Sequence, residues 1–158
     1  MKKIIYLGCL TVLLASCTNV RFVDPQPEDV EALIVIPEKY HGEYEYQDTS
    51  KKYSYVVTAN SIDGDVLGDS VIVKQRGNYF YVNCLSDGGY AVSVVEINQC
   101  LGYENIELTS FEITESNKHL FNVVEEQLDK SYLLGNVSSN QLNLLINSSE
   151  SVSLIRVR

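Results

Sequence analysis

We predict an all-β fold for this chain, an antiparallel meander or a small barrel of eight or nine short strands with one short helix near the C-terminal end. Apolar and polar residues alternate in several short segments of the 158 residues, as in strands that bury one face. Turn-forming residues separate these segments about every 8 to 12 residues. Tyrosine, which favours strands, occurs 11 times, and tryptophan is absent.

The N-terminal segment is typical of a secretory leader. Lys2 and Lys3 supply positive charge, and the apolar run Ile4–Leu14 is shorter than the roughly 20 residues that a membrane-spanning helix needs. Cys17 directly follows the sequence Leu-Ala-Ser. This arrangement resembles the lipobox of bacterial lipoproteins, and a plain secretory leader with a chance cysteine is the alternative.

The lipobox resemblance implies both processing and location. Residues 1–16 would be removed as a signal peptide, and Cys17 would receive a diacylglycerol on its thiol and an acyl chain on its new amino group. Two or three acyl chains hold a protein stably on a membrane. Thr18, rather than an aspartate, follows the cysteine, which in that family favours the outer membrane. We therefore expect a lipid-anchored protein of the cell envelope, facing the periplasm.

Residues 17–31 are expected to form an extended tether, and residues 32–158 a single β domain. Pro25 and Pro27 disfavour helix in the tether. The formal net charge of the chain is −9, and it becomes −11 when the leader takes Lys2 and Lys3 with it. A charge of this sign repels phosphate backbones, so we expect no nucleic-acid partner.

The first strand is expected around residues 40–46, after the apolar segment Leu33–Ile36. Alternation places Tyr44 and Tyr46 on one face of this strand. Gly42 and Tyr44 resemble the Gly-x-Trp that opens the first strand of lipocalin-like barrels, with tyrosine in place of tryptophan. The resemblance implies a lipocalin-like barrel.

The remaining strands follow at close spacing, and a short helix precedes the last one. Gly77 and Asn78 suit a tight turn between two of them, and Ser138 or Ser139 can cap the helix. The expected strands are 53–59, 70–76, 79–85, 90–97, 104–113, 120–126, 131–134 and 152–157, with the helix at 140–147.

A meander must hide its edge strands, and closure does so directly. We therefore expect the terminal strand to pair with the first one, which begins near His41. This pairing would bring Arg156 over the open end of the barrel, beside Tyr44.

The middle hairpin allows a prediction of register. A turn centred between Asp87 and Gly88 places Phe80 opposite Val95 and Cys84 opposite Ala91. Both faces of this hairpin are rather apolar, so both should be covered. The core would cover one face, and the Tyr40 region, the helix or a partner would cover the other.

The same register bears on the two cysteines of the domain. Cys100 lies nine residues beyond Ala91, the partner of Cys84, which is about 30 Å along a strand. A disulfide needs α-carbons within about 7 Å. We therefore expect two buried thiols without a bridge, unless the chain after Ile97 folds back.

No catalytic, metal or cofactor motif stands out. His41 and His119 lack the spacing of zinc ligands, and both are expected in solvent. Asp63, Asp65 and Asp69 could offer oxygen ligands to calcium, but we favour an ordinary acidic turn. We therefore expect no enzyme, no metal and no cofactor.

Two further kinds of site are weaker predictions. Asp69, Ser70 and Val71 resemble an O-glycosylation site of bacterial envelope proteins, with Ser70 as the acceptor. Tyrosine offers flat apolar area with one hydroxyl and is common at binding sites, although pleat packing is the alternative for each one. The candidate ligand-binding tyrosines are Tyr44, Tyr46, Tyr79, Tyr81 and Tyr90.

Three functions follow in order of preference. The first is a non-catalytic envelope module that binds a small apolar ligand or an unknown protein. The second is a periplasmic enzyme inhibitor or immunity-type lipoprotein, because the strand from Tyr81 to Cys84 resembles the Tyr-x-Cys region of periplasmic lysozyme inhibitors. A hydrolase with an unrecognised site ranks last.

Overall fold

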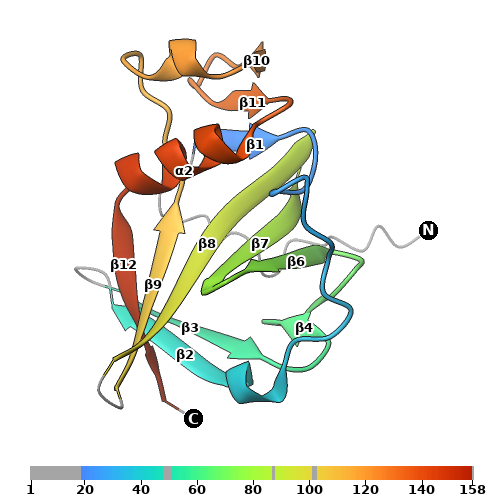
Figure 1. Cartoon of the computed structure of the whole chain (residues 1–158), viewed down its shortest axis with the longest axis vertical. Helices are drawn as coiled ribbons and strands as arrows, with labels where there is room; N and C mark the ends of the chain where they lie inside the picture. Colours follow the sequence, from blue (N-terminus) through green and yellow to red (C-terminus); the bar gives the residue numbers. More distant parts are fainter. Residues whose placement is uncertain (1–18, 48–50, 87, 101–102, 158) are drawn as a thin grey trace.

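The computed structural model describes residues 19–47, 51–86, 88–100 and 103–157 (Figure 1), and it confirms an all-β fold with a short C-terminal helix. The helical segments are η1 (Glu38–Tyr40), η2 (Lys118–Leu120) and α2 (Ser139–Ser148). The strands are β1 (Val20–Phe22), β2 (Gly42–Gln47), β3 (Lys52–Val57), β4 (Ser61–Ile62), β5 (Asp65–Val66), β6 (Val71–Arg76), β7 (Tyr79–Ser86), β8 (Gly89–Cys100), β9 (Tyr103–Ser110), β10 (Val123–Glu126), β11 (Tyr132–Leu134) and β12 (Ser151–Arg156).

The sheet is open, as in a meander and unlike a closed barrel, which were the two expected arrangements, and it has more strands than the expected eight or nine. Twelve strands are present in the described residues, and β8 pairs with β7, β9 and β1. The curved sheet runs from β6 through β7, β8, β9, β12, β2 and β3 to β4 and β5. The two ends of this run of strands, β6 and β5, form no ladder with each other, and the contacts near them are the isolated bridges from Ala32 to Lys74 and from Leu67 to Val71. Since β4 and β5 have two residues each, they are too short to form a continuous ladder with β6.

The pairing of the chain's last strand with β2 is confirmed. Ile155 of β12 faces Glu45, and Arg156 faces Tyr44. The Arg156 guanidinium lies 5.8 Å from the centre of the Tyr44 ring, a distance at which a cation is attracted to the ring face. The N-terminal and C-terminal strands of the curved sheet are thereby joined.

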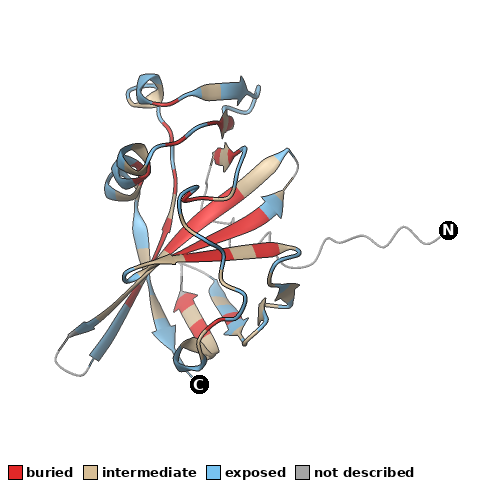
Figure 2. Ribbon diagram, turned by 45° about the vertical axis from the view of Figure 1, so that its right-hand side comes forward, coloured by how far each residue is buried: buried red, intermediate tan, exposed pale blue. Residues whose placement is uncertain are grey.

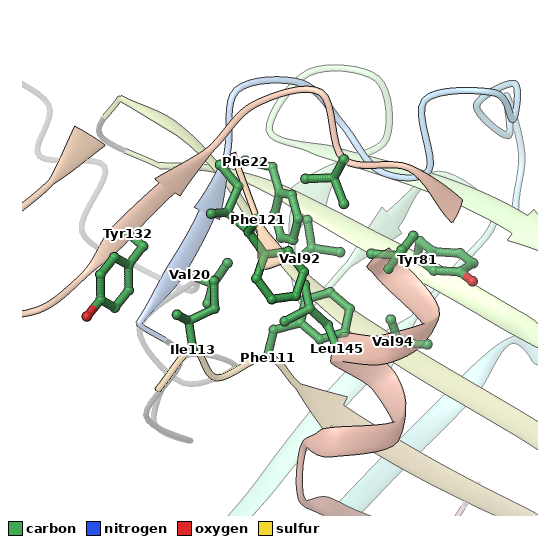
Figure 3. Packing of buried hydrophobic residues seen from close by; sticks show 13 residues of the cluster. Val20, Phe22, Tyr81, Val92, Val94, Phe111, Ile113, Phe121, Tyr132 and Leu145 are labelled. Carbon is green, nitrogen blue, oxygen red and sulfur yellow. The ribbon is translucent and has the colours of Figure 1, made fainter. Parts of the chain in front are cut away.

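The predicted register of the middle hairpin is also confirmed, with Phe80 opposite Val95 and Cys84 opposite Ala91. Both faces of the hairpin are covered, as expected. The ring of Tyr40 meets Phe80 edge-on at 4.7 Å on the concave face. On the convex face, α2 and β1 pack against β7 and β8 (Figures 1 and 3).

The helix begins where its cap was expected. The Ser138 hydroxyl accepts a hydrogen bond from the backbone N–H of Gln141, and the Gln141 side chain accepts one from the backbone N–H of Ser138. This reciprocal capping box satisfies two donors at the start of a helix. Leu142 and Leu145 then point into the convex-face core.

The expectation of a tether as far as residue 31 is wrong, because the domain begins by residue 19. Val20 and Phe22 of β1 are buried, and β1 pairs in parallel with β11. The prolines do keep this segment extended, but two buried side chains fasten it to the sheet. Asn83 bonds the backbone of Gln26, and Lys74 donates to the carbonyls of Pro25 (2.9 Å) and Pro27 (2.8 Å).

Cys84 carries a buried thiol on the concave face of β7, as expected. The side chain of Cys100 lies outside the described residues. Among the helices that the structure describes, none is long and apolar enough to cross a membrane.

Candidate functional site

The concave face of the curved sheet forms a small, partly open apolar cavity. Alternation along β7, β8, β9, β12, β2 and β3 turns one side chain in two towards this face. The resulting cavity has a volume of about 90 Å³. Its walls include Ile36, Tyr40, Phe80, Val95, Leu108 and Leu154. Figure 2 shows buried strand segments gathered where the sheet curves.

Tyr55 of β3 is a buried tyrosine in the wall of this apolar cavity. Its side chain lines the cavity and is 4% exposed. The phenolic oxygen is buried, and the rings of Tyr55 and Tyr46 stack with centroids 6.1 Å apart. Burial raises the pKa of Tyr55, and the neighbouring Tyr46 raises it further, so the hydroxyl stays protonated and can donate.

Tyr44 has a different role at the rim. Its hydroxyl donates to the carbonyl of Tyr40 at 2.7 Å. Arg156 covers its ring and donates to the carbonyls of Lys39 (2.9 Å) and His41. These contacts hold η1 against β12, so Tyr40 stays in place over Phe80.

The predicted ligand-binding tyrosines do not form one site. Tyr44 and Tyr46 lie on the concave face, and Tyr44 lines the cavity. The other three lie on the convex face, where Tyr81 is buried in the core (Figure 3), and Tyr79 and Tyr90 pack against that core. The reason is the register of β7 and β8, which places the odd-numbered residues of β7 opposite the concave side.

The other residues predicted as sites lie apart from the cavity. Ser70 is half-buried, and its hydroxyl accepts a hydrogen bond from the backbone N–H of Val66 in the turn before β6. His41 contacts the carbonyl of Ile36 at 2.8 Å, and His119 is exposed in η2. In the described part of the chain, no three His, Cys, Asp or Glu side chains gather as a metal site requires. Cys17 lies outside the described residues.

A second, wider hollow of about 650 Å³ lies between β1, β10 and β11 and the turn after β7. Its walls include Arg21, Glu125 and Asp129. Hydrogen bonds from Ser131 lower the pKa of Asp129, and the charge of Arg21 lowers it further. The lining of this hollow is partly polar and partly apolar, so it lacks the mainly apolar wall that is typical of small-molecule sites.

Sequence reasoning missed Tyr55 and the pair Asn83 and Lys74. Tyr55 lies in one of the expected strands, 53–59, and nothing in the sequence distinguishes it from the more exposed tyrosines. Asn83 and Lys74 did carry a signal, because each is a polar residue on the same strand face as Tyr81. Burial lowers the pKa of Lys74, whose ammonium group is held by two backbone carbonyls.

No protein-family model, no curated protein and no solved structure matches the chain. Any assignment of function therefore starts from the cavity itself.

Proposed function

We propose that the chain is a non-catalytic binding module that holds a small apolar molecule in the concave cavity. The observation that carries this proposal is a cavity on the concave face whose exposed lining is wholly apolar. Small-molecule sites are mostly apolar, with few polar groups that fix orientation. The wall offers no pairing of nucleophile, acid and base, since its residues are aliphatic and aromatic apart from Ser93.

The module would act in the cell envelope, on the periplasmic face of the outer membrane. Cys17 after Leu-Ala-Ser supports a lipid anchor at that point of the chain. Mass spectrometry of the native protein tests this part. We expect the masses of two or three acyl chains on Cys17 in the wild type, and none in a Cys17→Ser variant. An unmodified Cys17 in the wild type would remove the anchor from the proposal.

Methyl NMR tests the binding function on the purified protein, with xenon and cyclopentane as probes. We expect probe-dependent shifts in cavity methyl groups such as those of Val73 and Leu108, which line the wall. Val57→Phe replaces a small side chain of the cavity wall by a phenyl ring and should weaken these shifts at least fivefold. Val56→Phe is the matched control, because Val56 is the next residue of β3 and is 47% exposed. Absence of shifts with either probe would refute the binding function.

An inhibitor or immunity function remains the second proposal, but it needs another surface. The residues that resemble lysozyme inhibitors, Tyr81 to Cys84, are all buried in β7. A target enzyme could not contact them in the folded protein.

A further inference from the structure

The cavity also indicates what kind of molecule it holds, an inference that rests on the proposed binding function. We infer that the cavity takes the methyl end of an alkyl or acyl chain, roughly four carbon atoms deep, while the polar part of the same molecule stays outside. The ligand is then an amphiphile, and the cavity encloses only one end of it.

The lining of the cavity excludes polar atoms from the enclosed part of the ligand. The lining that a ligand can touch is wholly apolar. The hydroxyl of Tyr44 donates to the carbonyl of Tyr40, and the hydroxyl of Tyr55 is buried, so neither is open to a ligand. A hydroxyl or carboxylate group inside the cavity would lose its hydrogen bonds to water without replacing them. The enclosed part is therefore hydrocarbon.

The size of the cavity limits how much of the ligand it encloses. An apolar cavity of about 150 Å³ holds benzene. The cavity of about 90 Å³ observed here is too small for that ring, and by simple proportion it suits roughly four carbon atoms. Because the cavity is partly open, a chain can enter by its methyl end while the rest of the molecule remains outside.

A chain end also gains more than a molecule that the cavity encloses as a whole. Burial of one methylene group favours binding by about fourfold, so four of them give roughly 250-fold over water. Contacts of the remaining chain and of the head group outside the cavity add to this gain. A free hydrocarbon of four carbon atoms has no such contacts.

The rim of the cavity is charged, in contrast to its wall. Arg156 and Tyr44 are register partners on β12 and β2, so their side chains share the concave face. The Lys39 ammonium group lies 4.6 Å from the centre of the Tyr40 ring. Burial raises the pKa of Tyr44, the charge of Arg156 lowers it, and the charge of Glu104 raises it again. A head group outside the cavity would therefore lie among exposed charges of both signs, where it keeps its hydration.

The test uses n-octyl β-D-glucoside, below its micelle concentration, as an amphiphile with a neutral head group. In the wild type, we expect nuclear Overhauser effects between the terminal methyl protons of the octyl chain and the methyl groups of Val73 and Leu108 in the cavity wall. We expect none from the glucose protons to these groups. This measurement gives the direction of entry without any substitution.

A substitution then tests whether the chain end occupies this cavity. Val57→Phe should weaken the binding of octyl glucoside at least fivefold, because Val57 is part of the wall. Val56→Phe is the matched control, since Val56 is the next residue of β3 and is 47% exposed, and it should leave the dissociation constant unchanged.

The outcomes separate the inference from the binding function. If cyclopentane binds in the cavity and octyl glucoside does not, the inference is overturned and the binding function stands. The same holds if the glucose protons contact the wall, or if octyl glucoside binds equally well to Val57→Phe. If octyl glucoside, cyclopentane and xenon all fail to bind, the binding function itself fails.

Discussion

Replacing Asn83 by alanine should detach residues 24–29 from the sheet and destabilise the whole domain. Asn83 is fully buried on β7. Its side-chain oxygen accepts from the backbone N–H of Gln26 at 2.5 Å, and its amide nitrogen donates to the carbonyl of Gln26 at 2.8 Å. Alanine removes both partners and leaves two backbone groups of Gln26 buried without hydrogen bonds.

The magnitude follows from those two groups. Each buried polar group that loses its partner costs about 1–3 kcal/mol, so we expect Asn83→Ala to lower the free energy of unfolding by about 4 kcal/mol. Domains of this size are stable by about 5–15 kcal/mol, so the variant should fold but unfold at much lower urea concentration. Asn105→Ala is the matched control, because Asn105 is an exposed asparagine on β9, and it should change the free energy by less than about 0.5 kcal/mol.

Urea denaturation gives the free energy, and hydrogen exchange locates the change. The amide of Gln26 should exchange slowly in the wild type and rapidly in Asn83→Ala. A loss of under about 1 kcal/mol, together with an unchanged exchange rate at Gln26, would refute the idea that this side chain fastens the segment.

Three further substitutions test the packing. Leu145→Ala should lower the free energy of unfolding by about 3 kcal/mol in urea denaturation, because Leu145 is fully buried. Leu144 is 49% exposed and should tolerate alanine, so equal losses of stability in the two variants would contradict this. Ser138→Ala should cost about 1 kcal/mol by loss of the cap, seen as a lower Tm. Gly89→Ala should cost about 2 kcal/mol, because its Cβ would lie 2.6 Å from the Phe22 carbonyl oxygen; an unchanged Tm would argue against this contact.

Much of the central sheet could be predicted from the sequence, because local signals agreed there. Gly77–Asn78 and the turn near Gly88 fix two hairpins, and alternation then decides which residues face each other. Ser138 and the spacing of Leu142 and Leu145 fix the helix in the same way. The pairing of β12 with β2 followed from the need to hide sheet edges.

The features that the sequence did not predict share one cause, which is that they depend on contacts between residues far apart in the chain. β1 has three residues, and its pairing with β11 depends on a segment more than one hundred positions later. The nearby prolines predicted a tether, but hydrogen bonds from the buried side chains of Asn83 and Lys74 hold this segment on the sheet. The division of the tyrosines between two faces had the same origin, since covering both faces of β7 and β8 needs α2, β1 and η1 together.

The candidate site could be predicted only in its chemical type. Abundant tyrosines on adjoining strands indicated an aromatic surface, and Tyr44 does line the cavity. The buried hydroxyl of Tyr55 depends on how closely β2, β3 and β9 approach each other, as the cluster of Tyr46, Tyr55 and Leu108 shows. No pattern along one strand contains that information.

The firm attachment of Asn19 has a consequence for an acylated chain. Its side chain exchanges two hydrogen bonds with the backbone of Ile113, at 2.8 and 2.9 Å. Two residue steps, at most about 7 Å of chain, then separate it from Cys17. With lipid on Cys17, as proposed, the domain would sit directly on the headgroups of the membrane, and it would sample molecules that concentrate at the bilayer surface.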